Sequence, residues 1–216
     1  MNVIIDNFDL FFQGFLKTLG IGLICMVGSL ILGTIIAAFR VSPVAPLRAV
    51  GTLYVNLIRN CPLTVVLFLI AFGLPTIGIN QSYYFFGCSA LIIYTASFVC
   101  EALRSGINAI PAGQAEAARA IGLGFTQNLR HVILPQAFRT AIPPTGSVII
   151  AMFKNSAVLG VFGVSGDLLG NAIILTGSRG FDPVPVYLGI GFFFLMITIP
   201  AGLVLGYLER KAVILR

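Results

Sequence analysis

Long apolar stretches, separated by short polar segments, dominate the pattern of this 216-residue chain. No charged residue lies between Lys17 and Arg40, and none lies between Arg59 and Glu101. A helix needs about 20 mainly apolar residues to cross a bilayer. The second stretch is too long for one crossing, and GLPTIGINQSY at 73–83 has the glycine, proline and asparagine of a turn that divides it. The pattern predicts five membrane-spanning helices, at about 18–39, 52–73, 84–103, 143–163 and 185–208.

The composition supports a membrane protein. The chain is 58% hydrophobic and 9% charged, whereas soluble domains carry about 25% charged residues. The N-terminal MNVIIDNFDLFFQGF has two aspartates and no early lysine or arginine, so it does not read as a cleavable signal. We expect it to form a short helix on the membrane surface. Residues 1–216 are therefore predicted to form one all-α transmembrane domain.

The charges predict an orientation. In the five-span arrangement one side of the membrane holds most of the cations, which are Arg40, Arg48, Arg104, Arg119, Arg130, Arg139, Arg210, Lys211 and Arg216. The other side holds Lys17 and Arg179 with Asp6, Asp9, Asp167 and Asp182. Because cytoplasmic loops of membrane proteins are enriched in lysine and arginine, we expect the N-terminus outside and the C-terminus in the cytoplasm.

One polar, helix-prone stretch interrupts the apolar pattern between the third and fourth spans. EAARAIGLGFTQNLRHVILPQ, at 116–136, contains an alanine-rich helix that Gly122 ends, a reversal at Gly124 and a second helix that ends at Pro135. With the preceding turn it predicts a helical hairpin over about 106–136 on the cytoplasmic face. Paired helix formers and breakers are typical of a docking element rather than of an ordinary solvated loop.

These residues carry a family resemblance. Glu116, Ala117, Ala118 and Gly122, followed by Ile133-Leu134-Pro135, resemble the EAA loop of the permease subunits of ABC importers. YVNLIRNCPL (54–63), CEALRSGINAIPAGQ (100–114) and MFKNSAVLGVFGV (152–164) resemble the branch that imports polar amino acids. AFRVSP (38–43), GQAEAA (113–118) and KNSAV (154–158) resemble glutamate-type permeases, which implies glutamate as substrate, with glutamine or aspartate next. Asn56 and Asn60-Cys61 depart from the family pattern, which has Glu and Gly-Thr there, and this weakens residue-level statements about substrate contacts in the second span.

The resemblance implies a transmembrane subunit of a type I importer in a bacterial cytoplasmic membrane. Its partners would be a dimer of ABC ATPases, a second permease that is identical or paralogous, an extracytoplasmic substrate-binding protein and the lipid bilayer, with no nucleic acid. The coupling residues would be Glu116, Ala117, Ala118, Gly122, Leu123, Gly124 and Phe125, and Glu116 would pair with a cation or cap a helix. GxxxxGK[ST] is absent, so ATP and magnesium would be bound by the partner and this chain would hold no cofactor.

Polar groups inside predicted spans indicate a substrate pathway. An ionisable group at membrane depth usually faces a cavity or a partner. Lys154 lies about eleven residues into the fourth span, beside Asn155 and Ser156, while Arg59 lies near Pro62 at the edge of the second. We assign Arg59, Lys154, Asn155 and Ser156 to the pathway, although snorkelling to the interface would also explain the two cations.

The alternative functions explain fewer of these sequence features than an ABC permease does. GVSG at 163–166 resembles the Gly-x-Ser-Gly of intramembrane serine proteases, but His131 is expected on the opposite side of the membrane from Ser165. A channel or secondary transporter would explain Arg59 and Lys154 and leave the hairpin without a purpose. An importer of a basic amino acid such as arginine remains an alternative function.

Two further sequence features indicate packing. Cys25, Cys61, Cys88 and Cys100 show no metal-site spacing, and GLVLG at 202–206 indicates close helix packing.

Overall fold

The computed structural model describes residues 2–212, and every regular element within them is helical. In chain order these are α1 (Asn2–Asp6), α2 (Phe8–Val41), α3 (Ala45–Arg59), α4 (Leu63–Phe68), α5 (Leu74–Thr76), α6 (Tyr83–Asn108), α7 (Ala112–Ala120), α8 (Phe125–Asn128), α9 (Leu134–Asn155), α10 (Leu168–Ile173) and α11 (Pro183–Ala212). Short π-helical turns cover Leu69–Gly73, Leu129–Ile133 and Ile174–Ser178, and a 3₁₀ segment covers Ser156–Phe162.

Four helical stretches are long and apolar enough to cross a membrane, and a bent pair makes up to five. The four are Phe8–Val41, Tyr83–Asn108, Phe125–Phe162 and Pro183–Lys211. Each overlaps a predicted span and extends beyond it. The all-α membrane fold is thus confirmed. The predicted surface helix at the N-terminus is wrong in extent, because α2 already begins at Phe8 and leaves only α1 before it.

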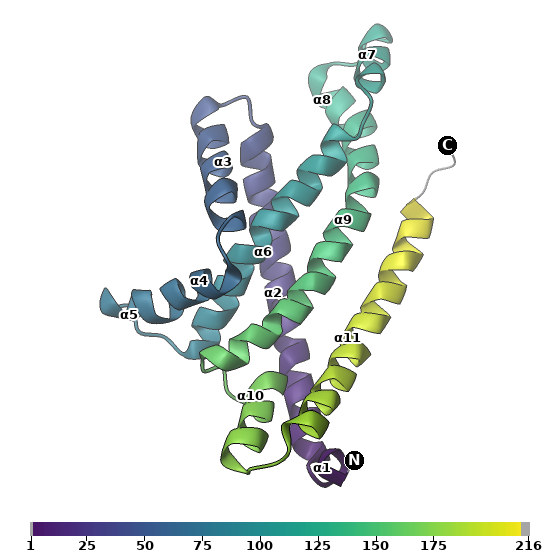
Figure 1. The fold of residues 1–216 in the computed structure, drawn as a ribbon. Helices are drawn as coiled ribbons and strands as arrows, with labels where there is room; N and C mark the ends of the chain where they lie inside the picture. The colour runs from purple at the N-terminus through teal and green to yellow at the C-terminus, as the bar shows by residue number, and fades with distance from the viewer. Residues whose placement is uncertain (1, 213–216) are drawn as a thin grey trace.

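The second span is not one straight helix over 52–73. Ala45–Arg59 and Leu63–Thr76 form a pair bent by 104°. Pro62 has extended backbone (φ −60°, ψ 139°) just before α4, and a proline disfavours helical geometry at the residue before it. Its ring also lacks the N–H that a continuous helix would need. The break therefore sends α4 and α5 sideways from the bundle, as Figure 1 shows.

The second helix of the hairpin does not end at Pro135. The helical stretch continues from Phe125 to Phe162, so hairpin and fourth span are one rod. Pro135 lies in the first turn of α9, directly after the π turn at Leu129–Ile133. A π turn redistributes backbone hydrogen bonds locally, and the start of a helix tolerates a residue without an N–H. A short apolar helix over Leu168–Ser178, between the fourth and fifth predicted spans, was not expected from the sequence.

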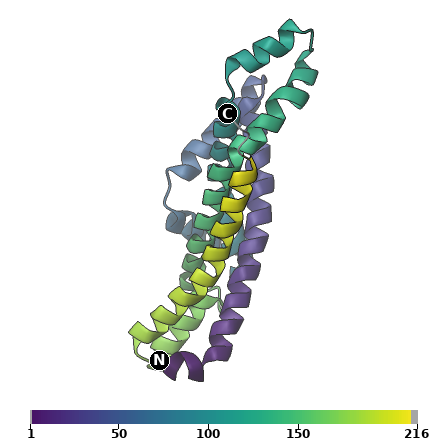
Figure 2. The same cartoon turned by 90° about the vertical axis from the view of Figure 1, so that its right-hand side faces the viewer.

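The helices form an elongated bundle with two distinct ends (Figures 1 and 2). The hairpin projects at one end, where α2 and α11 also end, while α1 and α10 lie at the other. At the hairpin end, the last turn of α2 contains Arg40, and the last turn of α11 contains Arg210 and Lys211. Arg216 lies outside the described residues. A central apolar core includes Ile21, Leu67, Leu91, Met152 and Leu159, and a second core near α1 and α10 includes Phe11, Leu168, Leu175 and Val186.

Candidate functional site

The hairpin turn depends on a left-handed glycine. Gly122 has φ +86°, a conformation that costs a residue with a side chain about 1–2 kcal/mol. Its N–H donates to the Arg119 carbonyl at 3.0 Å, and the Leu123 N–H donates to the Ala118 carbonyl at 3.1 Å. These bonds satisfy carbonyls at the end of α7 in the manner of a glycine-terminated helix. Gly124 does not reverse the chain through a positive φ (φ −67°), but caps the start of α8.

The tip of the hairpin presents apolar side chains to its surroundings. Ile121 is 79% exposed and Phe125 is 83% exposed. Glu116 and Ala117 are also exposed, whereas Ala118 is buried. Within residues 2–212 Glu116 makes no ion pair and caps neither helix of the hairpin, so its role in pairing or capping stays a prediction.

One buried bond holds the two arms of the hairpin together. Asn128 is 7% exposed, and its Nδ2 donates to the Ala115 carbonyl at 3.0 Å. The donor lies in α8 and the acceptor in α7. The hairpin is therefore a defined protrusion, with an apolar tip held by backbone and side-chain bonds at its base.

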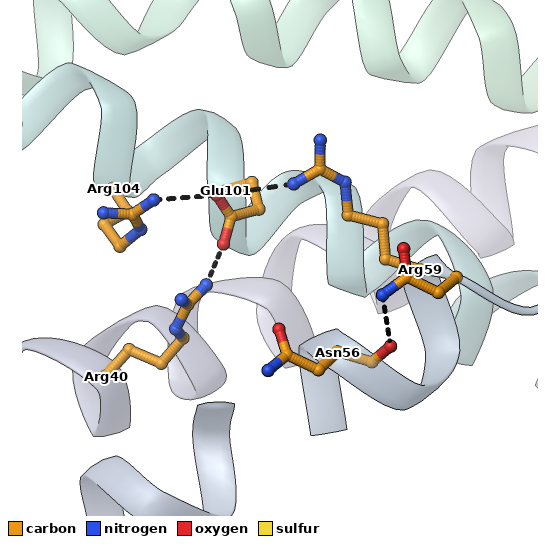
Figure 3. A network of polar contacts seen from close by, with 6 residues as sticks. Arg40, Asn56, Arg59, Glu101 and Arg104 are labelled. Carbon is orange, nitrogen blue, oxygen red and sulfur yellow. Dashed lines mark hydrogen bonds and ion pairs between the residues drawn. The ribbon is translucent and has the colours of Figure 1, made fainter. Parts of the chain in front are cut away.

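Three arginines converge on the carboxylate of Glu101 (Figure 3). Arg40 contacts Oε1, Arg104 Nη2 lies 3.0 Å from Oε2, and Arg59 Nη1 lies 3.6 Å from Oε2. They come from α2, α6 and the end of α3, so one carboxylate joins three elements. Three cations on one anion leave a net charge of about +2 in a half-buried environment. Such a cluster attracts a further anion.

Of these four residues only Arg59 was predicted to belong to a functional site, while Arg40 and Arg104 entered only as cytoplasmic cations. A signal for Glu101 was present, because it is the only acidic residue between Asp9 and Glu116 and lies in an apolar stretch. An acid in such a place is expected to have a partner. Its partners could not be identified from spacing, since Arg40 lies 61 residues away along the chain.

Arg59 is the most loosely held of the three cations. Its side chain is 49% exposed, against 14% for Arg40 and 36% for Arg104. Its guanidinium carbon lies 5.8 Å from the centre of the Phe98 ring, within the range of a cation–π contact. Arg59 is the last residue of α3, directly before the break at Pro62.

Phe98 also lines a cavity of about 180 Å³ between α6 and α9. The other lining residues are Tyr94, Thr95, Val148, Ala151, Met152 and Asn155. Thr95 is 2% exposed, and within the described chain its hydroxyl has no hydrogen-bond partner. Because a buried hydroxyl without a partner is costly, Thr95 is suited to a polar ligand in this cavity.

The four predicted pathway residues do not lie in one site. Asn155 lines the cavity and Arg59 lies over its Phe98 wall. Lys154 is exposed and is not among the lining residues. Ser156 is 2% exposed, and its hydroxyl donates to the Phe153 carbonyl at 2.7 Å, which places it in the packed core.

A second polar cluster lies at the end of the bundle near α1. Asp167 is 1% exposed and accepts a hydrogen bond at 2.8 Å from the Gly170 N–H, which caps α10. Burial raises the pKa of Asp167 to about 6, although the Gly170 bond and the charge of Lys17 act to lower it. Lys17 itself donates to the Ser165 carbonyl, and Thr18 accepts from the Leu168 N–H at 3.0 Å. The cluster fastens the α10 loop to α2.

The groups needed for serine protease chemistry are far apart. Ser165 precedes α10 at one end of the bundle, whereas His131 lies in the π turn next to the hairpin at the other end (Figure 1). A nucleophile and its base must lie within hydrogen-bond reach. Across residues 2–212 no three His, Cys, Asp or Glu side chains are grouped as metal ligands.

Comparisons with known proteins agree on one family. The family model of the "Binding-protein-dependent transport system inner membrane component" matches residues 29–214. The chain is 40% identical over 214 residues to a "Probable glutamine ABC transporter permease protein" of Bacillus subtilis, covering 98% of this chain and 97% of that protein. It is 42% identical over 213 residues to a "Glutamate transport system permease protein" of Corynebacterium glutamicum, covering 92% of each.

A solved structure shows the same architecture. The crystal structure of an amino acid ABC transporter with histidines contains a chain 32% identical to this one, with a TM-score of 0.91 and 97% of each chain covered. A match this complete means that the broken second span, the hairpin and the helix after the fourth span belong to a shared fold.

Proposed function

The chain belongs to the family of inner membrane components of binding-protein-dependent transport systems, the permease subunits of ABC importers, and from that premise we propose that it moves glutamate or a related polar amino acid and couples this movement to a partner ATPase. As a permease it is a transport subunit. The observation that carries the coupling proposal is the hairpin tip, where Ile121 and Phe125 are 79% and 83% exposed. Apolar side chains this exposed at a rigid protrusion are suited to a cleft on a partner.

The rest of the assembly follows the same proposal. Two permeases, identical or paralogous, form the pathway; an ATPase dimer binds ATP and magnesium; and an extracytoplasmic binding protein delivers the substrate. The cation-rich hairpin end faces the cytoplasm, which leaves α1 and α10 outside. The coupling residues are Glu116, Ala117, Ala118, Gly122, Leu123, Gly124 and Phe125. Ala118 is buried and supports the turn through its carbonyl, while the other six contact the ATPase. The connection of α8 to α9 in one rod supports transmission of the ATPase movement into the membrane.

The cavity between α6 and α9 is the proposed substrate site. Its volume of about 180 Å³ suits one amino acid of moderate size. Thr95 and Asn155 supply hydrogen bonds, and the Arg59 guanidinium, over the wall formed by Phe98, binds a carboxylate. Arginine is suited to this because its guanidinium can hold both carboxylate oxygens. Lys154 is exposed but outside the cavity lining, and Ser156 is buried, so both join the proposed pathway only through a movement of α9.

Charge favours an acidic or neutral substrate over a basic one. The Glu101 cluster carries about two unpaired positive charges, and its Arg59 lies over the Phe98 wall of the cavity. A lysine or arginine substrate would be repelled at that point, whereas a glutamate side chain would be attracted. Glutamate is therefore the first candidate, followed by glutamine and aspartate. An importer of arginine is the alternative that this charge disfavours, and a carrier without an ATPase would leave the hairpin unexplained.

Two measurements test the proposal. Cells lacking this chain should lose most high-affinity uptake of labelled glutamate and regain it when the chain is restored. Affinity purification of the tagged chain in mild detergent should recover an ABC ATPase by mass spectrometry. Unchanged glutamate uptake in the deletion strain would refute the substrate, and failure to recover an ATPase even after crosslinking would refute the coupling.

A further inference from the structure

A long apolar groove runs along the bundle between α2, α9 and α11. Its volume is about 610 Å³, and a smaller hollow of about 170 Å³ continues it through shared lining residues that include Thr34 and Phe138. On α2 the lining runs from Leu19 to Thr34. At about 1.5 Å per residue this is about 22 Å, more than half of the roughly 30 Å hydrocarbon core of a bilayer. The groove is long enough for an acyl chain from one leaflet.

Helix register places cations at the hairpin end of this groove. Val204 and Leu208 line it, and Lys211 continues the same stripe of α11, seven residues after Val204 and three after Leu208. On α9, Ile142 and Gly146 line it, and Arg139 lies three and seven residues before them.

Both cations are free to bind an anion there. Arg139 and Lys211 are exposed, and neither has an ion-pair partner within residues 2–212. The Lys211 ammonium lies 4.8 Å from the centre of the Tyr207 ring, and tyrosines are enriched where a membrane meets water. The groove therefore combines an apolar floor with two available cations at one mouth.

A second permease is a poorer occupant than lipid. The groove is lined by α9 residues Gly146, Ile149 and Ile150, whereas the substrate cavity is lined by Val148, Ala151 and Asn155. At 3.6 residues per turn these sets lie on opposite sides of α9. If the pathway lies between two permeases, as proposed above, the partner covers the cavity side. The groove side then faces the bilayer.

We propose that the groove binds an anionic phospholipid, with an acyl chain along α2, α9 and α11 and its phosphate held by Arg139 and Lys211. Basic pockets between transmembrane helices on the cytoplasmic side are suited to anionic headgroups. This site is distinct from the substrate cavity. It rests on the proposed position of the second permease, but its test reads lipid binding rather than transport.

The chain contains no tryptophan, which allows a direct test. Phe138 lines both parts of the groove and is 60% exposed, so Phe138→Trp introduces a reporter there. The assembled transporter is reconstituted in phosphatidylcholine nanodiscs with increasing brominated phosphatidylglycerol, or with brominated phosphatidylcholine for comparison. The signal of the transporter without the substitution is subtracted. Leu203→Trp, 70% exposed and outside the groove lining, reports bulk lipid.

Brominated phosphatidylglycerol should quench the emission of the Phe138→Trp reporter at a much lower mole fraction than brominated phosphatidylcholine does, with no such difference at the Leu203→Trp reporter. Arg139→Gln and Lys211→Gln should each weaken the phosphatidylglycerol preference roughly fivefold. Arg48→Gln, which removes an exposed cation of α3, should leave it unchanged. Equal quenching by both lipids at the Phe138→Trp reporter would mean bulk lipid only. No quenching by either would mean that protein fills the groove, and either result overturns the proposal.

Discussion

Arg59 Nη1 lies 3.6 Å from Oε2 of Glu101, so the last residue before the break in the second span is linked to α6 by charge. The same carboxylate also holds Arg40 and Arg104. Because Arg59 is half exposed and Glu101 is largely buried, the contact can open on the Arg59 side while the other two pairs persist. This relationship connects the proposed substrate site to the framework of the bundle.

Removing the Arg59 guanidinium should impair transport more than folding. Arg59→Ala should lower kcat/KM for glutamate uptake about 10- to 100-fold, since hydrogen bonds to charged groups contribute about 1.5–3 kcal/mol. Arg59→Lys should recover only part of this because an ammonium cannot hold both carboxylate oxygens. Uptake by whole cells, normalised to membrane content of the chain, checks this. Arg48→Gln is the matched control, and a normal rate in Arg59→Ala would exclude Arg59 from substrate binding.

Glu101 should matter mainly for stability. Glu101→Gln removes the only anion among three cations. Removing one partner of a buried ion pair costs about 3–5 kcal/mol, and the lower end applies here because the cluster is partly exposed. We expect a lower unfolding temperature of the purified transporter and a lower yield in the membrane. Arg104→Gln should cost much less, because Arg104 is 36% exposed and is only three residues from Glu101 on the same helix. Equal effects of the two substitutions would argue against Glu101 as the residue that connects α2, α3 and α6.

Gly122→Asp should abolish transport while membrane insertion stays intact. The substitution adds a side chain at φ +86° and places a charge at the apolar tip. Gly113→Asp is a matched control, since Gly113 lies in the exposed first turn of α7 with open space around it and without a positive φ. Glutamate uptake and co-purification of the ATPase should both fall in Gly122→Asp, and both should be unchanged in Gly113→Asp. Normal uptake by Gly122→Asp would show that the hairpin is not the coupling element.

The buried carboxyl of Asp167 should make stability depend on pH. Its pKa is raised from 3.8 to about 6, so between these values the unfolded chain ionises while the folded chain stays protonated. Stability should therefore fall as pH rises from about 4 to about 6, by up to about 3 kcal/mol, and then level off. The unfolding temperature of the purified transporter across this range measures it.

Asp167→Asn should flatten that pH dependence. Asparagine also caps helices well, so the bond to the Gly170 N–H can be kept without a buried charge. The variant should be more stable than the parent above pH 6. If its profile follows that of the parent, another group is responsible for the dependence.

The sequence by itself determined the membrane class, the approximate positions of the long apolar helices and the hairpin turn. These depend on local properties: the length of an apolar stretch relative to the bilayer, and the need for glycine at a positive φ in Gly122. The family resemblance rested on the same residues, and the comparisons confirmed it. Sequence rules failed at two prolines. Pro62 breaks the second span, which was predicted to be continuous. Pro135 does not end its helix, because the π turn before it redistributes the backbone hydrogen bonds.

Only the tertiary structure decided which distant side chains meet. Arg40 and Glu101 are 61 residues apart, and their contact depends on how α2 packs against α6. The same packing separates Ser156, which is buried against the Phe153 carbonyl, from Asn155, which lines a cavity one residue away. Helix spacing places neighbours on different faces, but which face meets a cavity depends on the helices around it.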